Sequence, residues 1–371
     1  MSFCLMASFA EVISYAGYVL LAVLVLLAMI TVHEFGHFIA GKIFGFGIDE
    51  FAIGFGPKLF SKKKKNGEVF SIRLLPIGGF CAFRGEDKDD EDPSAFNNKK
   101  PWQRIIVLVS GAFMNYLLAL LLIILMFGIY GQSALMTGKL SGEGEEGYSF
   151  YERDVILTAN GKNAYMLTDL MNAVNGKKQG EEVPFTVYRD GVKKDITVKM
   201  ICDADFKSVE DVTTLYKALG VYYETDETGG MVNGGMYSTS VRLGFFATIG
   251  RSFDYSFKVA GTVFKVLGEL LTGALGIKSL GGTVTTVAVA AGAIKTGGFK
   301  YLLNVASFIG VNLAVFNLLP IPALDGSRAV FTAVEWVRGK PLNRRVEGII
   351  HMVGFVLILL FAVIVDLQRC F

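Results

Sequence analysis

TVHEFGHFIAG, residues 31–41, places three ionisable side chains at the end of a long apolar run. His33, Glu34 and His37 would each be costly to bury in lipid, because a polar group loses its hydration there. The run itself, residues 15–40, is long enough to cross a bilayer, which needs about 20 apolar residues. Ionisable residues inside a membrane span usually mark a functional site, so this stretch predicts both a span and a site.

The composition of the whole chain also indicates a membrane protein. Of its 371 residues, 52% are hydrophobic and 19% are charged, and the mean hydropathy is +0.47. Such averages require long apolar stretches. The net charge of +2 is too small to indicate nucleic-acid binding. The cysteines stand apart without CxxC spacing, which argues against a disulfide framework and a cysteine zinc site; they are Cys4, Cys81, Cys202 and Cys370.

Four apolar stretches predict a polytopic α-helical membrane protein with about four transmembrane helices. They are residues 15–40, 105–130, 301–319 and 348–365. Basic residues follow the first stretch, precede the second and separate the third from the fourth, and such residues favour the cytoplasmic side. Both chain termini and residues 131–300 are therefore expected outside the cytoplasm.

The external region is expected to contain a small α+β domain over residues 140–224. FTVYRDGVKKDITV alternates around Asp190-Gly191, which predicts a hairpin. DVILTANG predicts a further strand that ends in an Asn-Gly turn. Thr168 is expected to cap a short helix over residues 169–174.

The next segment is expected to link this domain to the last spans. Residues 225–240 are glycine-rich and predict a loop. Residues 241–275 are apolar with scattered charges, which predicts an amphipathic helix at the membrane surface. Residues 283–294 are apolar but short. Because two extra crossings would leave the later orientation unchanged, the charge bias also permits six spans.

The spacing of the two histidines predicts a metal site. His33 and His37 are four residues apart, so on a helix they project from one face and can bind one zinc ion. Glu34 can reach a water at the open metal position and accept its proton. The chain has only three histidines, and two of them are in this motif.

A third ligand must come from elsewhere, because catalytic zinc usually has three protein ligands and a water. The favoured candidate is Asp325 in FNLLPIPALDG, residues 316–326, where two prolines end or kink a helix. Broken helices are tolerated at membrane depth where they line a cavity. His351 is the other candidate, although a histidine packed near an interface is the favoured interpretation of that residue.

Several motifs together resemble the site-2 protease family of intramembrane zinc metalloproteases. The resemblance is strongest to its bacterial branch of the regulator-of-sigma-E protease type, and it covers nearly the whole chain. The motifs are HEFGH, GFGPKLF at 54–60, IRLLPIGGF at 72–80, QRIIVLVSGAFMN at 103–115 and NLLPIPALDG.

The resemblance implies a role for each site residue. His33, His37 and Asp325 would be the ligands of one Zn²⁺ ion, and Glu34 would be the general base. Asn317 would hold the substrate backbone near the metal. These roles are those of an endopeptidase that hydrolyses peptide bonds within transmembrane segments.

The resemblance also implies an architecture. VFSIRLLPIGGF, residues 69–80, would be a membrane-associated β-hairpin that dips into the membrane on the cytoplasmic side, and its exposed strand edge would pair with an unwound substrate helix. The inserted extracytoplasmic domain would be a single PDZ-like domain. The implied parts are residues 1–135 (first membrane part), 140–224 (PDZ-like domain), 225–297 (linker and surface helix) and 298–371 (second membrane part).

The expected setting is a bacterial cell membrane, with the protein crossing it several times. The expected partners are the lipid bilayer and single-span proteins such as anti-sigma factors or remnant signal peptides. No nucleic-acid partner is expected.

Two other functions fit parts of the sequence. One is a membrane-anchored PDZ scaffold with an inactive or merely structural metal site. The other is a membrane zinc peptidase that cuts soluble peptides at the membrane face and takes its third ligand from a glutamate, such as Glu335 or Glu347. The complete set of three ligands and a base favours the intramembrane protease, because a decayed enzyme would be expected to have lost Glu34.

Overall fold

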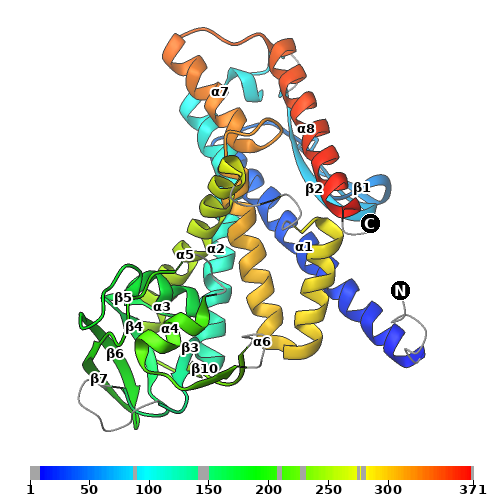
Figure 1. Cartoon of the computed structure of the whole chain (residues 1–371). Helices are drawn as coiled ribbons and strands as arrows, with labels where there is room; N and C mark the ends of the chain where they lie inside the picture. Colours follow the sequence, from blue (N-terminus) through cyan, green and yellow to red (C-terminus); the bar gives the residue numbers. More distant parts are fainter. Residues whose placement is uncertain are drawn as a thin grey trace. The chain divides into compact units, whose positions relative to one another are not determined.

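The computed structural model describes residues 9–86, 90–140, 150–206, 211–225, 231–273, 276 and 281–368 (Figure 1). The chain divides into two compact units. One comprises Met1–Ile123 together with Tyr255–Phe371, and the other comprises Ile124–Asp254. We call the first the helical unit and the second the sheet unit.

Long apolar helices make up most of the helical unit. Within the described ranges, four helices are long and apolar enough to cross a membrane, and each contains one predicted span. The predicted polytopic helical fold is therefore confirmed. These helices are α1 Phe9–Ile43, α2 Pro101–Tyr130, α6 Thr283–Leu318 and α8 Arg344–Leu367.

Helix α6 begins well before the predicted start of the third span at residue 301. Gly298 interrupts it with φ 59° and ψ −142°, a conformation that glycine adopts without a steric penalty. The chain turns back at this break (Figure 1), so Ile294 and Leu302 share one apolar cluster with Ala22 of α1. The short apolar segment 283–294 is thus the first part of a bent helix.

The remaining helices of this part of the chain are shorter or more polar. Helix α5 Phe245–Thr272 lies within the predicted amphipathic segment 241–275, and it is not among the candidate spans of the described residues. Helix α7 Asp325–Arg338 starts directly after the two prolines. A short 3₁₀ helix, η1, covers Phe96–Asn98. The location of α5 at a membrane surface stays a prediction.

A β-hairpin is present between α1 and α2, but residues 69–80 do not form it alone, because the chain turns between Lys63 and Val69 and these residues all lie in the second strand. Strand β1 Ile48–Lys63 pairs with β2 Val69–Phe83 in a bent arrangement. Ala52 pairs with Phe80 on one side and with Ser71 on the other, so residues 50–53 lie inside this small sheet. Large apolar side chains of the hairpin are exposed, which fits a membrane-associated element; they include Phe55, Leu59, Phe60, Leu74 and Leu75.

The sheet unit is built on strands in the order β10-β3-β4-β6-β7, with β5 paired to β4. Their bounds are β3 Gln132–Thr137, β4 Val155–Ala159, β5 Lys162–Asn163, β6 Glu182–Arg189, β7 Val192–Lys199 and β10 Met236–Val241. Both sequence-predicted turns occur. Asp190 and Gly191 have φ of 52° and 80°, and Asn160 and Gly161 have φ of 49° and 73°, as expected for tight hairpin turns.

Two local predictions for this region are wrong. Residues 225–240 are not a simple loop, because β8 Tyr223–Thr225 pairs with β9 Met231–Gly234, and β10 pairs with β3. Gly235, with φ 84°, lies between β9 and β10. Thr168 is not a cap either. Helix α3 Leu167–Val174 begins two residues before the predicted start, and the Asp169 carboxylate accepts hydrogen bonds from the backbone N–H groups of Tyr165 and Met166.

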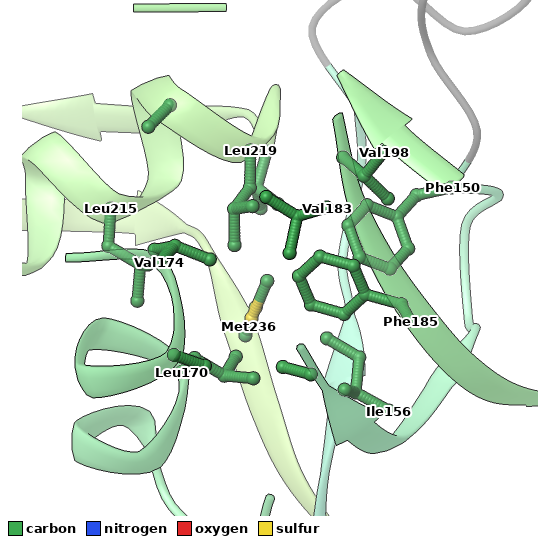
Figure 2. Close-up of a cluster of buried hydrophobic side chains, with 14 of the residues drawn as sticks. Phe150, Ile156, Leu170, Val174, Val183, Phe185, Val198, Leu215, Leu219 and Met236 are labelled. Carbon is green, nitrogen blue, oxygen red and sulfur yellow. The ribbon is translucent and has the colours of Figure 1, made fainter. Parts of the chain in front are cut away.

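Figure 2 shows the core of the sheet unit, where α3 and α4 Val212–Leu219 pack on the sheet. Phe185 and Ile156 come from strands, and Leu170 and Leu215 come from the two helices. Each of these side chains is at most 1% exposed. Strands β3 and β10 lie outside the predicted interval 140–224, yet Leu135 and Met236 contribute to this core.

Candidate active site

The two histidines of HEFGH lie on one face of α1 and point toward each other. Their ring centroids are 4.7 Å apart with the rings nearly perpendicular, and their Nε2 atoms are 3.1 Å apart. Each residue is 7% exposed. The four-residue spacing therefore produces the expected convergence of imidazoles.

Asp325 joins this pair from a segment 292 residues away. Its Oδ2 atom lies 2.8 Å from His33 Nε2 and 3.3 Å from His37 Nε2. One ligand atom from each residue lies within 4.8 Å of the other two, which is close enough to share a metal ion. Two imidazole nitrogens and one carboxylate oxygen form a ligand set found in catalytic zinc sites, so the residues present fit zinc.

Outer hydrogen bonds can fix both imidazoles. His37 Nδ1 lies 2.8 Å from the carbonyl oxygen of Val107, so an Nδ1–H would donate and leave Nε2 free as a ligand atom. His33 Nδ1 lies 3.4 Å from the amide Nδ2 atoms of both Asn115 and Asn317. If either amide is rotated by 180°, its oxygen accepts from a His33 Nδ1–H.

Asn115 is a site residue that the sequence analysis did not single out. It is 0% exposed, and within the described part of the chain its Oδ1 atom has no hydrogen-bond partner, as expected if this oxygen faces His33 in the rotated amide. The available signal was an amide side chain inside the apolar span 105–130. Asn317, which the family resemblance pointed to, is only partly buried.

Glycines let three helices approach closely at the site. A Cβ atom on Gly111 of α2 would lie 2.5 Å from His37 Nε2 and 2.7 Å from His33 Cε1. A Cβ on Gly36 of α1 would overlap the carbonyl oxygen of Ser110, and one on Gly310 of α6 would lie 2.9 Å from Ala119 Cβ. Small residues of this kind allow backbones to pack closely inside membranes.

Glu34 is held away from the group of three ligands. Its Oε2 atom accepts a hydrogen bond from the backbone N–H of Cys81 in β2 at 2.9 Å. A Cβ on Gly79 would lie 3.6 Å from Glu34 Cγ, so the strand passes close to this carboxylate. The side chain therefore lies between the motif helix and the hairpin, a position compatible with a base rather than a ligand.

The other candidate third ligands have partners elsewhere. His351 Nδ1 accepts a hydrogen bond from the backbone N–H of Ala323 at 3.0 Å. Glu335 lies 2.7 Å from Arg104, and both side chains are 6% exposed. Burial alone would raise the pKa of Glu335, but hydrogen bonds from Leu342 N and Arg104 outweigh it and lower the pKa. Glu347 pairs with Arg344 at 2.9 Å.

Comparison with known proteins places the whole chain in one family. The model of peptidase family M50 matches residues 21–361. A candidate zinc metalloprotease of Clostridium perfringens is 31% identical over 356 residues, which cover 95% of this chain and 98% of the relative. The zinc metalloprotease RasP of Bacillus licheniformis is 29% identical, with 94% of this chain and 98% of RasP covered. The chain belongs to peptidase family M50, the site-2 protease family.

Proposed function

We propose that this zinc metalloprotease cleaves transmembrane segments within the bilayer. The observation that carries the proposal is the convergence of His33, His37 and Asp325 among helices apolar enough to span a membrane. Burying three such groups in an apolar setting is expensive, and shared ligation of an ion accounts for the cost.

In the proposed mechanism, four residues bind the metal ion and transfer protons during peptide hydrolysis. His33, His37 and Asp325 would hold Zn²⁺, which lowers the pKa of a bound water to about 7 and polarises a carbonyl group. Glu34 is the general base: its carboxylate accepts a proton from the attacking water and returns one to the leaving amine. Oε2 can keep the hydrogen bond from Cys81 N–H while the second carboxylate oxygen, Oε1, accepts the proton from water.

The substrate must be extended before hydrolysis, because a helical peptide bond is shielded by its own turn. We propose that residues 79–83 of β2 present an edge to which the unwound substrate adds as a strand. Two contacts support this: Ala52 pairs with Phe80 on one side of this segment, and Cys81 N–H points away from β1 to Glu34. Asn317, beside His33, is proposed to hold the substrate backbone.

The proposed setting follows from the basic segments of the sequence. With residues 62–65 in the cytoplasm, the active site lies near the cytoplasmic side of a bacterial cell membrane, and both termini and the sheet unit lie outside. Proposed substrates are single-span proteins such as anti-sigma factors and remnant signal peptides. The sheet unit is proposed to act as a PDZ-like filter or docking point that excludes substrates with bulky outer domains.

Glu34→Gln tests the proposal directly. The amide has nearly the same shape but accepts no proton, so the variant is expected to retain zinc and lose about 100- to 10,000-fold in cleavage of a single-span reporter reconstituted in vesicles. Zinc content and cleavage rate are measured on the same purified sample. A variant that retains zinc and cuts at the wild-type rate would remove Glu34 from the mechanism. Wild-type protein that cuts only a soluble peptide would contradict the intramembrane activity.

A further inference from the structure

Asp325 follows a tight turn whose geometry is unusual for its sequence. The turn comprises residues 321–324 and is closed by a hydrogen bond from Leu324 N to Ile321 O at 3.1 Å. Pro322 is its second residue, and Ala323, its third, has φ 83°. Proline in second place with a positive φ in third place defines a type II turn, which normally has glycine at the third position. The alanine side chain therefore makes this turn intrinsically unfavourable.

A histidine on α8 compensates for this. The central peptide of a type II turn is rotated by about 180° relative to the common type I form, which turns the N–H of the third residue to the opposite side. In this orientation Ala323 N–H donates to His351 Nδ1 at 3.0 Å. In a type I turn the same N–H would point away, so the hydrogen bond favours the type II form. The ring of Phe331 meets the His351 ring edge-on at 5.5 Å.

A glycine on the same face of α8 brings the helix close enough for this contact. Gly354 is three residues after His351, so both face the same neighbour. A Cβ on Gly354 would lie 2.7 Å from the carbonyl oxygen of Pro322 and would overlap the proline ring. The helix thus lies directly against the turn at both ends of its central peptide.

The turn determines where Asp325 is presented. Only Leu324 separates the strained residue from the aspartate that starts α7. Rotation of the central peptide changes ψ of Pro322 and φ of Ala323 in opposite senses, and the part of the two changes that does not cancel displaces the chain leading to Asp325. Asp325 Oδ2 must lie 2.8 Å from His33 Nε2. Ligand geometry tolerates little displacement.

We propose that His351 is a positioning residue that holds the turn 321–324 in its type II form and so places Asp325 against His33 and His37. This inference rests on the proposed function in one respect, the assignment of Asp325 as a metal ligand. His351, a candidate ligand on sequence grounds, acts in this proposal through the backbone of Ala323.

The test uses four variants of the full-length chain in detergent micelles. His351→Ala removes the acceptor, and His351→Asn retains one near the position of Nδ1. The double variant His351→Ala with Ala323→Gly supplies a residue that adopts positive φ without a steric penalty. Met352→Ala is the matched control, because Met352 is the neighbouring residue on α8 and is 61% exposed. Zinc dissociation constants come from chelator competition, and amide exchange of residues 320–326 is followed on zinc-free protein.

His351→Ala is expected to weaken zinc binding about 10-fold, the lower end of the effect of losing an outer hydrogen-bond partner, and to speed exchange of the Ala323 amide. His351→Asn and Met352→Ala should remain within about 2-fold of wild type. The double variant should recover most of the zinc affinity while its amide still exchanges fast. Unchanged affinity and exchange in His351→Ala, or a double variant no better than the single one, would overturn the proposal.

Two further measurements keep the result unambiguous. If His351→Ala does not fold, Ala323→Val tests the turn with the histidine intact: a β-branched residue strongly disfavours positive φ, so zinc binding should weaken, and unchanged binding would overturn the proposal. Asp325→Ala tests the ligand assignment separately. If that variant kept its zinc affinity, the proposed ligand set would fail, whereas amide exchange in His351→Ala would still decide whether the histidine holds the turn.

Discussion

The proposed metal centre and the core of the sheet unit are both largely buried, but they are built in different ways. The core consists of ordinary apolar side chains such as Phe185 and Leu170, which can be exchanged for others of similar volume at modest cost. The metal centre depends on individual atoms: Gly111 has no room for a methyl group beside His37, and Asn115 is fully buried beside His33.

This difference predicts where the chemistry is sensitive. Changes of a few atoms at the proposed centre should weaken zinc binding or slow hydrolysis, while large changes in the sheet unit should leave both near wild type. The predictions below follow the expected effect on the chemistry from the largest to the smallest.

Among changes outside the proposed ligands and base, Gly111→Ala is expected to have the largest effect. The new Cβ would lie 2.5 Å from His37 Nε2, so the imidazoles must move, and displacements of about 1 Å can cost about 100-fold in rate. Alanine favours helix more than glycine does, so a loss cannot come from helix propensity. The control is Gly128→Ala on the same helix, where a Cβ meets nothing within 4 Å. Equal zinc content and cleavage rate in the two variants would show that the contact between Gly111 of α2 and the histidines of α1 tolerates a methyl group.

The two asparagines beside His33 are expected to differ in effect. Asn115→Ala should weaken zinc binding about 10-fold, since this buried amide holds the imidazole from behind. Asn317→Ala should mainly raise KM for a single-span substrate, because its partly buried amide is the one available to substrate. Chelator competition and steady-state kinetics separate the two effects. If Asn115→Ala instead raised KM and Asn317→Ala weakened zinc binding, the roles of the two asparagines would be the reverse of those proposed.

Removing most of the sheet unit should affect the chemistry least. Thr137 of β3 pairs directly with Met236 of β10, so residues 138–235 can be replaced by Asn-Gly, which favours a two-residue hairpin. Leu135 and Met236 lose their core partners and are replaced by threonine in the same variant. Zinc content and cleavage of short substrates should stay near wild type, while substrates with bulky outer domains should now be cut. A truncated protein that binds zinc but cuts no substrate would contradict the proposal that the sheet unit acts as a substrate filter.

The long apolar helices and the tight hairpin turn could be predicted from the sequence, because nearby residues determine them. The HEFGH spacing, the apolar runs and the Asp190-Gly191 turn each act over a few residues, and the structure contains the helices and the hairpin they imply. Strand β10 and the early start of α6 were not predicted. Glycine-rich sequence is typical of loops, and only the distant partners show that β10 pairs with β3 and that α6 continues past a bend at Gly298.

The candidate site shows the same division. Bringing Asp325 to the histidines required either the family resemblance or a depth argument, because nothing local connects segments 292 residues apart. The contact of Asn115 with His33 could not be predicted, since an amide inside an apolar helix indicates a buried polar group but not which residue is its partner.

The most direct test of the central claim is zinc X-ray absorption spectroscopy, with zinc affinity, on wild type and Asp325→Ala. Wild type should bind one zinc per chain with two imidazole nitrogens and at least one carboxylate oxygen in its coordination shell. Asp325→Ala should lose the carboxylate contribution to the spectrum. Loss of an outer hydrogen bond typically costs about 10- to 100-fold in zinc affinity, and loss of Asp325 should cost more than that. Asp203→Ala, which removes a carboxylate that is 55% exposed in the sheet unit, should change neither. An unaltered spectrum and affinity in Asp325→Ala would contradict the account, because the third ligand would then have to come from another residue.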